Sequence, residues 1–390
     1  MGRQLARARA PRDRVLIYGL GGGRGHAARA LGLADGFRSL GLSPLVILPK
    51  RFAPGGLNRN TVDTCNTVDT YNAVDTCNAR NTCDDEVPPN TETFFVDRPT
   101  SSAALWRVVE RLIERWQPGT FIVDTFPRGV LGELNLGALV ELVPRRILLT
   151  RYVRPPFQTL LREVSDAAYY ECIVDLESHL GWLDRLPQKI AFGPIVGSNS
   201  DTPDAANISN EPDVDVGAVG AANVETVDNV DVLMVSSMSD PVLDQFLRRL
   251  AERLRRAGLS TTCIIPDQPM SSERANPLAH SHSHSHSHAA SLVQSTSFRY
   301  ASIQRAHVVV GAAGYNLTYE CARAGTWHVS VPRPRRLDDQ HLRARAMAIT
   351  SSSPRTLEDN VRALIERGVR RTRHLTVHSC TALAQHLLDA

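Results

Sequence analysis

The sequence predicts an α/β protein built from two doubly wound domains that face each other across a cleft. Three observations predict this architecture. The chain has 390 residues, which is about the length of two domains. Short apolar runs alternate with amphipathic segments in both halves, as they do in parallel sheets covered by helices on both faces. Polar low-complexity segments interrupt this alternation, and we interpret them as insertions.

In the first half, the apolar runs predict strands and the amphipathic segments predict helices in regular order. The first helix is expected to end at Gly41, because glycine commonly stops helices. The predicted strands are Val15–Gly19, Leu45–Leu48, Thr93–Val96, Phe121–Asp124, Arg146–Thr150 and Glu171–Val174. The predicted helices are Ala27–Leu40, Ala103–Trp116 and Val130–Leu142.

The second half repeats the pattern. Its predicted strands are Val232–Ser236, Ser260–Ile265, His307–Gly311 and His328–Val331. Its predicted helices are Pro241–Ala257, Leu317–Ala324, Asp339–Ala348, Leu357–Arg367 and Ala382–Leu388. Ligands of such sheets bind beyond the carboxyl ends of the strands, so we expect functional residues in the loops that follow the strands.

The low-complexity segments set the predicted domain boundaries. Residues 53–90 contain a six-residue repeat rich in Asp, Asn and Thr, with too few apolar residues to bury a solenoid core, so we predict a disordered insertion. Residues 268–290 are rich in His and Ser and are expected to form an untethered polar insertion. We therefore divide the chain into a basic tail (1–13), an N-terminal domain (14–196), a linker (197–229), a C-terminal domain (230–376) and a C-terminal helix (377–390).

Composition and charge exclude several classes of protein. The sequence has 44 Lys and Arg and 41 Asp and Glu, which gives a net charge of +3. This charge is too small for a dedicated nucleic-acid binder. No run of about 18 apolar residues predicts a membrane span, and the basic N-terminus lacks the apolar region of a signal peptide, so we expect a cytoplasmic protein. The arginine-rich tail leaves a peripheral membrane contact open. Seven cysteines without a CxxC motif predict neither a zinc site nor a disulfide framework.

The loop Gly19–His26 joins the first predicted strand to the first helix. Glycines let the backbone turn sharply and approach a ligand, and the helix that follows offers N–H groups to an anion. The spacing of these glycines matches neither a dinucleotide fingerprint nor a Walker loop. We therefore expect Gly22, Gly23 and Gly25 to line a phosphate or sugar, without a named nucleotide.

His26 and Asp124 are the candidate catalytic residues. His26 stands where the loop becomes helix, and a neutral imidazole there can take a proton from a hydroxyl near pH 7. Asp124 ends the strand FIVD and can orient His26 or an acceptor hydroxyl. Each residue has a purely structural alternative, because His26 can pack the turn and Asp124 can cap a helix or turn.

A second turn of small residues follows the strand His307–Gly311. It lets a diphosphate approach the N-terminus of the next helix, where Glu320 can accept hydrogen bonds from ribose hydroxyls. Further candidates follow the next strand. They are Arg333, Arg335 and Arg336 for phosphate and Asp339 with Gln340 for sugar hydroxyls.

The run VVVGAAGYNLTYECARAG, followed by VP and DDQ, resembles the C-terminal donor-binding domain of GT-B glycosyltransferases of family 28. These are related to the bacterial enzyme that adds N-acetylglucosamine to the lipid-linked peptidoglycan precursor. GGGRGHAARALGLADGF resembles the opening loop and first helix of the same group. The resemblance implies the GT-B architecture, with two Rossmann-like domains, no catalytic metal and no cofactor. It also implies an NDP-sugar, most often a UDP-sugar, on the C-terminal domain and an acceptor against the N-terminal one.

The resemblance implies roles for single residues as well. The matched positions are His26 for the histidine of the N-terminal loop, Gly314, Tyr315 and Asn316 for the phosphate-facing turn, Glu320 for the ribose-binding glutamate, and Asp339 with Gln340 for the sugar-contacting pair. The glycines of the first loop then lie on the acceptor side. A C-terminal helix that crosses back onto the first domain is also implied, and Ala382–Leu388 can supply it.

One turn departs from the family. The strand that begins at Val232 is followed by Ser236, Ser237, Met238 and Ser239, where the family has a glycine-rich turn. Serine hydroxyls can still donate to phosphate.

The leading hypothesis is a metal-independent hexosyltransferase in which His26 deprotonates the acceptor. The alternatives are a nucleotide-sugar epimerase of the same fold, a sugar-nucleotide-binding protein without catalysis and, last, an NAD-dependent oxidoreductase.

Overall fold

The computed structural model contains both predicted sheets. It describes residues 13–21, 24–50, 93–96, 101–129, 131–155, 158, 166–183, 189–196, 230–236, 241–264, 300–335, 337–347, 349–350, 354–368 and 375–389. The predicted repeat insertion, linker and His/Ser-rich insertion lie outside these residues, as does the predicted tail except for its last residue. The predicted domain boundaries therefore stay predictions.

The first domain is built on a seven-stranded sheet in which every recorded strand pairing is parallel. The strand order is β3-β2-β1-β4-β5-β6-β7. The strands are β1 (Arg14–Tyr18), β2 (Ser43–Pro49), β3 (Thr93–Val96), β4 (Thr120–Asp124), β5 (Arg145–Thr150), β6 (Cys172–Asp175) and β7 (Lys189–Ala191).

Helices cover both faces of this sheet because side chains alternate along its buried strands. Val15 and Ile17 of β1 pack on the side of α1 (Arg24–Ser39) and α10 (Cys380–Asp389). Leu16 and Tyr18 pack on the side of α2 (Ser102–Trp116) and α3 (Leu136–Leu142). The near-continuous apolar sequence of β1 is thus explained by burial on both faces.

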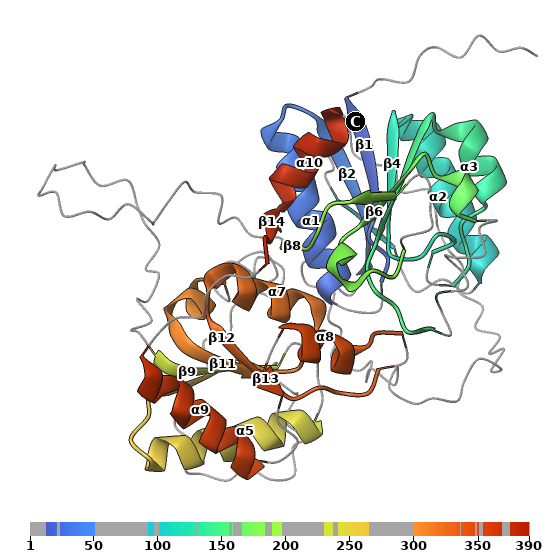
Figure 1. Ribbon diagram of the computed structural model, residues 1–390. Coiled ribbons are helices and arrows are strands. Elements are labelled where there is room, and N and C mark those ends of the chain that lie inside the picture. Colours follow the sequence, from blue (N-terminus) through green and yellow to red (C-terminus); the bar gives the residue numbers. More distant parts are fainter. Residues whose placement is uncertain are drawn as a thin grey trace, which may run out of the picture.

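The second domain is built on a five-stranded parallel sheet of order β10-β9-β11-β12-β13. Its strands are β9 (Val230–Val235), β10 (Thr261–Ile264), β11 (Ala306–Gly311), β12 (Trp327–Ser330) and β13 (Ile349–Thr350). Its helices are α5 (Pro241–Arg256), α7 (Tyr315–Ala324), α8 (Gln340–Met347) and α9 (Pro354–Arg367). In Figure 1, α7 and α8 lie on the side of this sheet that faces the first domain, and α5 and α9 lie on the opposite side.

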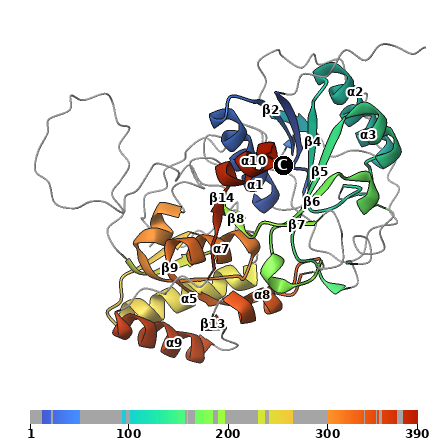
Figure 2. The ribbon, with the colours of Figure 1, turned by 45° about the horizontal axis from the view of Figure 1, so that its top comes forward.

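The end of the chain returns to the first domain. Leu383, Ala384 and Leu387 of α10 share a core with Leu33 and Phe37 of α1, and the two helices lie side by side in Figures 1 and 2. Just before α10, β14 (His378–Ser379) pairs with β8 (Ile195–Val196), which follows β7. The C-terminal helix therefore has the position that the resemblance implies.

Both sheets have a topological switch point, where successive connections leave toward opposite sides. In the first sheet it lies between β1 and β4, and in the second between β9 and β11. Ligands of doubly wound sheets bind outside the carboxyl ends of the strands at such points. The first switch point carries the loop to His26 and the end of β4 at Asp124, and the second carries Ser236 and the turn at Gly314.

The third helix of the first domain, α3, begins later in the sequence than predicted. It begins at Leu136, because Gly129 and Gly132 have φ values of 77° and 71°, which are left-handed and not helical. Asn135 caps the helix, and its side chain accepts a hydrogen bond from the N–H of Ala138 at 3.3 Å. The residue at 130 lies outside the described residues. The short strands β7, β8, β13 and β14 were not predicted from the sequence.

We predict that Gly36→Ala destabilises the fold through the contact between α1 and α10. A Cβ atom at Gly36 would lie 2.9 Å from Cα of Thr381 and 3.0 Å from the carbonyl oxygen of Cys380, so one helix backbone must move. The expected cost is about 1–3 kcal/mol, as for other overpacked sites. Urea denaturation of the full chain measures it.

The matched control is Gly137→Ala in α3. There the nearest atom to a new Cβ is Oδ1 of Asn135 at 3.6 Å, and alanine favours helix over glycine by about 1 kcal/mol. Gly137→Ala should therefore be neutral or stabilising. Equal stabilities of the two variants would contradict the proposed closeness of α1 and α10.

Candidate active site

The two candidate catalytic residues meet at the first switch point. Nδ1 of His26 lies 2.8 Å from Oδ2 of Asp124, and both residues are 7% exposed. Asp124 is brought there by the end of β4 and His26 by the first turn of α1. Gly21 is required beside them, because a side chain at Gly21 would overlap the ring of His26.

A third residue, Arg29, completes this cluster. Its Nη2 donates to both carboxylate oxygens of Asp124, at 2.8 and 3.2 Å. The hydroxyl of Thr125 donates to Oδ1 of Asp124 at 2.9 Å. Although burial by itself raises the pKa of Asp124, the charges of Arg29 and His26 hold that pKa well below its usual range. Asp124 is therefore ionised and accepts all of these bonds.

The ionised carboxylate fixes the tautomer of His26. Because Asp124 accepts, Nδ1 of His26 carries the proton and Nε2 keeps a lone pair. Burial, the largest influence, lowers the pKa of His26 below its ordinary value; Asp124 opposes this effect, and the charges of Arg29 and Arg151 add to it. His26 is thus neutral at pH 7, the form that can accept a proton.

The backbone beside this cluster is strained. Thr125 has a φ of 78°, in the left-handed region that β-branched residues rarely adopt. Its N–H donates to the carbonyl oxygen of Leu149 in the neighbouring strand at 2.6 Å, and its side chain is fully buried. Strain of this kind costs about 1–3 kcal/mol and is found most often at functional sites. The left-handed conformation of Thr125 turns the chain directly after Asp124.

The cluster touches the second domain through Arg29. Nη1 of Arg29 donates to Oδ1 of Asn316 in the first turn of α7 at 3.3 Å, and its guanidinium lies 4.9 Å from the ring centre of Tyr315. Gly25 lies at the same contact, since a Cβ atom there would be 3.5 Å from Oδ1 of Asn316. The predicted catalytic side and the predicted phosphate-facing turn are therefore neighbours.

A buried network joins the two domains next to this contact. Glu177, which follows β6, is 0% exposed and accepts from Nε and Nη2 of Arg343 on α8, at 2.7 and 3.1 Å. Glu177 also accepts from the hydroxyl of Tyr319 at 2.6 Å and from the N–H of Tyr152 at 2.9 Å. Arg343 is 1% exposed, so neither charge of the pair is solvated.

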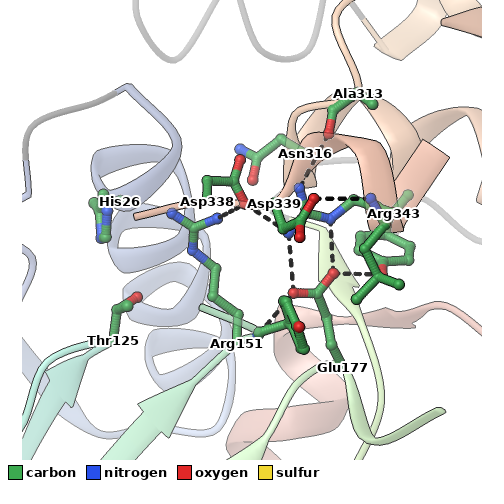
Figure 3. A network of polar contacts seen from close by, with 12 residues as sticks. His26, Thr125, Arg151, Glu177, Ala313, Asn316, Asp338, Asp339 and Arg343 are labelled. Carbon is green, nitrogen blue, oxygen red and sulfur yellow. Dashed lines mark hydrogen bonds and ion pairs between the residues drawn. The ribbon is translucent and has the colours of Figure 1, made fainter. Parts of the chain in front are cut away.

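Asp338 extends the network toward the predicted catalytic residues. It accepts from Nη2 of Arg343 at 2.8 Å and from Nη1 of Arg151, which follows β5, at 3.1 Å. The dashed lines in Figure 3 trace these bonds from Arg151 to Arg343 and Glu177. Despite its burial, the two guanidinium groups lower the pKa of Asp338 to about 2. The charges of Arg343 and Arg151 are thus balanced by those of Glu177 and Asp338.

The predicted donor-side residues gather around α7 and α8, although not all of their side chains are available to a ligand. Tyr315 is buried, and its hydroxyl accepts from the N–H of Ile195, so its ring belongs to the domain junction. Asp339 caps α8 by accepting from the N–H of Leu342 at 2.9 Å. Gln340 accepts from the N–H of Arg333 through Oε1 at 2.9 Å.

The remaining predicted site residues divide into two groups. Ser236 is buried at the end of β9, Glu320 is buried on α7, and the carbonyl oxygen of Arg335 accepts from Nη1 of Arg154 at 3.2 Å. Gly314 is the N-cap residue of α7. The predicted residues outside the described part of the chain are Gly22, Gly23, Ser237 and Arg336.

Several residues of the candidate site were not predicted from the sequence. Arg29 could have been found, because residues three apart on a helix share a face and His26 was already singled out. Glu177 and Arg343 carried no comparable signal, since only the approach of the two domains makes them partners. Asp338 stands next to the matched Asp339 but was not distinguished from it.

Comparison with known proteins identifies the fold. No family model matches the chain, and no curated protein sequence matches it. Among solved structures, the glycotransferase of kitacinnamycin is 11% identical with a TM-score of 0.52, over 97% of this chain and 99% of that one. MurG of Acinetobacter baumannii is 13% identical with a TM-score of 0.50, over 97% and 100%. The spinosyn forosaminyltransferase SpnP is 14% identical with a TM-score of 0.51, over 92% and 90%.

The chain has the GT-B fold. The predicted fold class is thereby confirmed, because these neighbours match over nearly the whole chain. In the GT-B arrangement the two switch points belong to different domains, and here Arg29 and Asn316 bring them into contact.

Three features are absent from the described residues. No helix among them is both long enough and apolar enough to cross a membrane. No three of their His, Cys, Asp and Glu side chains are arranged to hold a metal ion. The cysteines that the structure describes, at 172, 263, 321 and 380, are not joined by disulfides.

We predict that Arg343→Met destabilises the protein by about 3–5 kcal/mol, because it leaves Glu177 as a buried charge without its main partner. Adding Glu177→Gln removes that charge and should restore a large part of the loss. Urea denaturation of the single and double variants gives the coupling energy between the two residues.

The control is Arg362→Ala, which removes an exposed pair with Glu358 on α9. Exposed pairs contribute about 0–1 kcal/mol, so this variant should be close to the wild type. If Arg343→Met were no less stable than Arg362→Ala, the domain junction would not depend on the buried pair.

Proposed function

We propose that the chain transfers a hexosyl group from an NDP-sugar, with a UDP-sugar as the first candidate, to an acceptor hydroxyl without a catalytic metal. The observation that carries the proposal is the buried His26–Asp124 pair, which Arg29 joins to Asn316 at the N-terminus of α7. A neutral histidine that can serve as the base therefore lies on the same chain of contacts as a helix N-terminus that suits a diphosphate. The glycosyl-transfer activities named for the neighbours of this fold support the same reaction class.

The donor diphosphate binds at the N-terminus of α7 in this proposal. The first N–H groups of a helix have no partner within the helix, and the dipole favours an anion there. Gly314 caps the helix without a side-chain hydrogen bond, and a Cβ atom built on it would meet no atom within 4 Å. The backbone is thus open to a ligand at the point where Asn316 faces Arg29. Glu320, further along α7, binds the ribose hydroxyls.

The sugar lies toward α8. Because Oε1 of Gln340 accepts from the N–H of Arg333, the amide nitrogen of Gln340 is left to donate to a sugar hydroxyl. Oδ1 of Asp339 caps α8, and its other oxygen accepts from a sugar hydroxyl. Positive charge from Arg335 and Arg336 stabilises the leaving diphosphate.

In the reaction, the acceptor oxygen attacks the anomeric carbon and its proton passes to Nε2 of His26. The bond from the anomeric carbon to the diphosphate oxygen breaks, and the electron pair leaves with the diphosphate. Asp124 holds His26 in the required tautomer and stabilises the imidazolium that forms. The N-terminus of α7 stabilises the charge that develops on the diphosphate.

We predict that His26→Ala lowers the rate of UDP release from UDP-hexoses by about 10²–10⁴-fold, because the general base is lost. Water serves as the acceptor in this assay, and chromatography measures the UDP. The affinity for UDP should change less than about threefold, because His26 acts on the acceptor. The rate of the wild type should fall as the pH drops below the lowered pKa of His26, where the ring is protonated.

The control is His307→Ala, an exposed histidine on β11, which should keep the wild-type rate. UDP release that is unchanged in His26→Ala would remove His26 from the mechanism. Conversion of the hexose to its epimer without UDP release would favour the epimerase alternative. UDP binding without either reaction would favour a binding protein.

A further inference from the structure

Arg29 is a charged residue in a buried position. It is 2% exposed on the buried side of α1, one turn after His26. A buried guanidinium is costly unless it is paired and hydrogen-bonded. Here it is paired with Asp124, and its second nitrogen bonds the other domain. The residue therefore connects the two halves of the proposed site, a role that rests on the proposed function.

Toward the first domain, Arg29 fixes the orientation of Asp124. One guanidinium nitrogen is shared between the two carboxylate oxygens, and the hydroxyl of Thr125 holds one of them. The other oxygen accepts from His26 at 2.8 Å. With these three donors in place, the carboxylate cannot rotate away from Nδ1 of His26.

Toward the second domain, Arg29 fixes the amide of Asn316. A guanidinium only donates hydrogen bonds, so the atom of Asn316 that faces it must be the oxygen. The amide nitrogen must then point the other way, with its two N–H groups directed away from Arg29. Since Asn316 lies in the first turn of α7, these are additional donors beside the helix N-terminus.

We propose that Arg29 is a positioning residue that aligns Asp124 with His26 and, through the same guanidinium, orients the amide of Asn316 toward the donor diphosphate. It touches neither reacting atom. It makes the geometry of the base and that of the donor turn depend on one side chain.

The positive charge of Arg29 lowers the pKa of His26, so removing this charge should change that pKa in a known direction. The charged groups that face His26 are Asp124 from β4, Arg29 from its own helix and Arg151 from the segment after β5. Nη2 of Arg29 lies 3.4 Å from Nδ1 of His26 and opposes its protonation. Without Arg29, Asp124 would stabilise the imidazolium with less competition. The pKa of His26 should therefore rise.

NMR titration of the full chain with ¹³C-labelled histidine rings tests the first half of the proposal. The His26 signal is assigned by its absence from His26→Gln. Arg29→Gln should raise the pKa of His26 by about one unit, because it removes a positive charge at close range. The control Arg38→Gln removes a half-buried arginine paired with the exposed Asp35 on the same helix and should leave that pKa unchanged. The alignment itself is read from the tautomer of neutral His26 in the same spectra. In Arg29→Gln the tautomer protonated at Nδ1 should lose population, because Asp124 is no longer held against Nδ1. Unchanged tautomer populations would overturn the proposal.

Arg29→Lys tests the second half and remains informative if Arg29→Gln does not fold. Lysine keeps the charge but lacks the planar fork that reaches Asp124 and Asn316 together. The affinity for UDP, measured by calorimetry, should fall about 3–10-fold in Arg29→Lys and stay unchanged in Arg38→Gln. Wild-type affinity in Arg29→Lys would overturn the role at Asn316.

The two halves of the test separate this inference from the proposed function. A wild-type chain that binds no UDP would contradict the function, whereas the tautomer of His26 would still decide whether Arg29 positions the pair.

Discussion

The ion pair between Glu177 and Arg343 is the interaction on which the rest of the structure depends. It crosses from the end of β6 to α8 and is shielded from water on both sides. Buried charges tolerate little displacement, because separating them exposes each to a low-dielectric interior without a partner. Tyr319, Asp338 and Arg151 extend the same constraint along the junction. These contacts fix the position of one sheet relative to the other. Packing of apolar side chains alone would define that position less strictly.

The relative position of the two sheets brings together the two halves of the proposed site. In each sheet the strand order creates a switch point, and residues there have side chains or N–H groups directed past the strand ends. His26 and Asp124 belong to one switch point, and the turn at Gly314 belongs to the other. The contact between Arg29 and Asn316 forms only because the junction brings these ends together. The proposed base and the proposed anion site therefore depend on the arrangement of the domains as much as on local sequence.

The sequence was sufficient for what depends on local pattern. Strands such as β1 are buried on both faces and show as apolar runs, and α7 follows a recognisable turn of small residues. The pairing of His26 with Asp124 was one of the alternatives that the sequence left open, because His26 follows the end of β1 and Asp124 ends β4. The start of α3 was misjudged because left-handed glycines interrupt an apolar stretch that resembles a helix. The partners Glu177 and Arg343, 166 residues apart, could not be found, because no periodicity encodes a contact between domains.

The most direct test of the account is calorimetry of the purified full chain with UDP, with NADH as the competing ligand. The account predicts that UDP binds, that Glu320→Ala abolishes the binding because the ribose loses its acceptor, and that Glu366→Ala, at an exposed glutamate on α9, leaves it intact. Binding of NADH alone, or UDP binding that survives Glu320→Ala, would contradict a nucleotide-sugar site at α7.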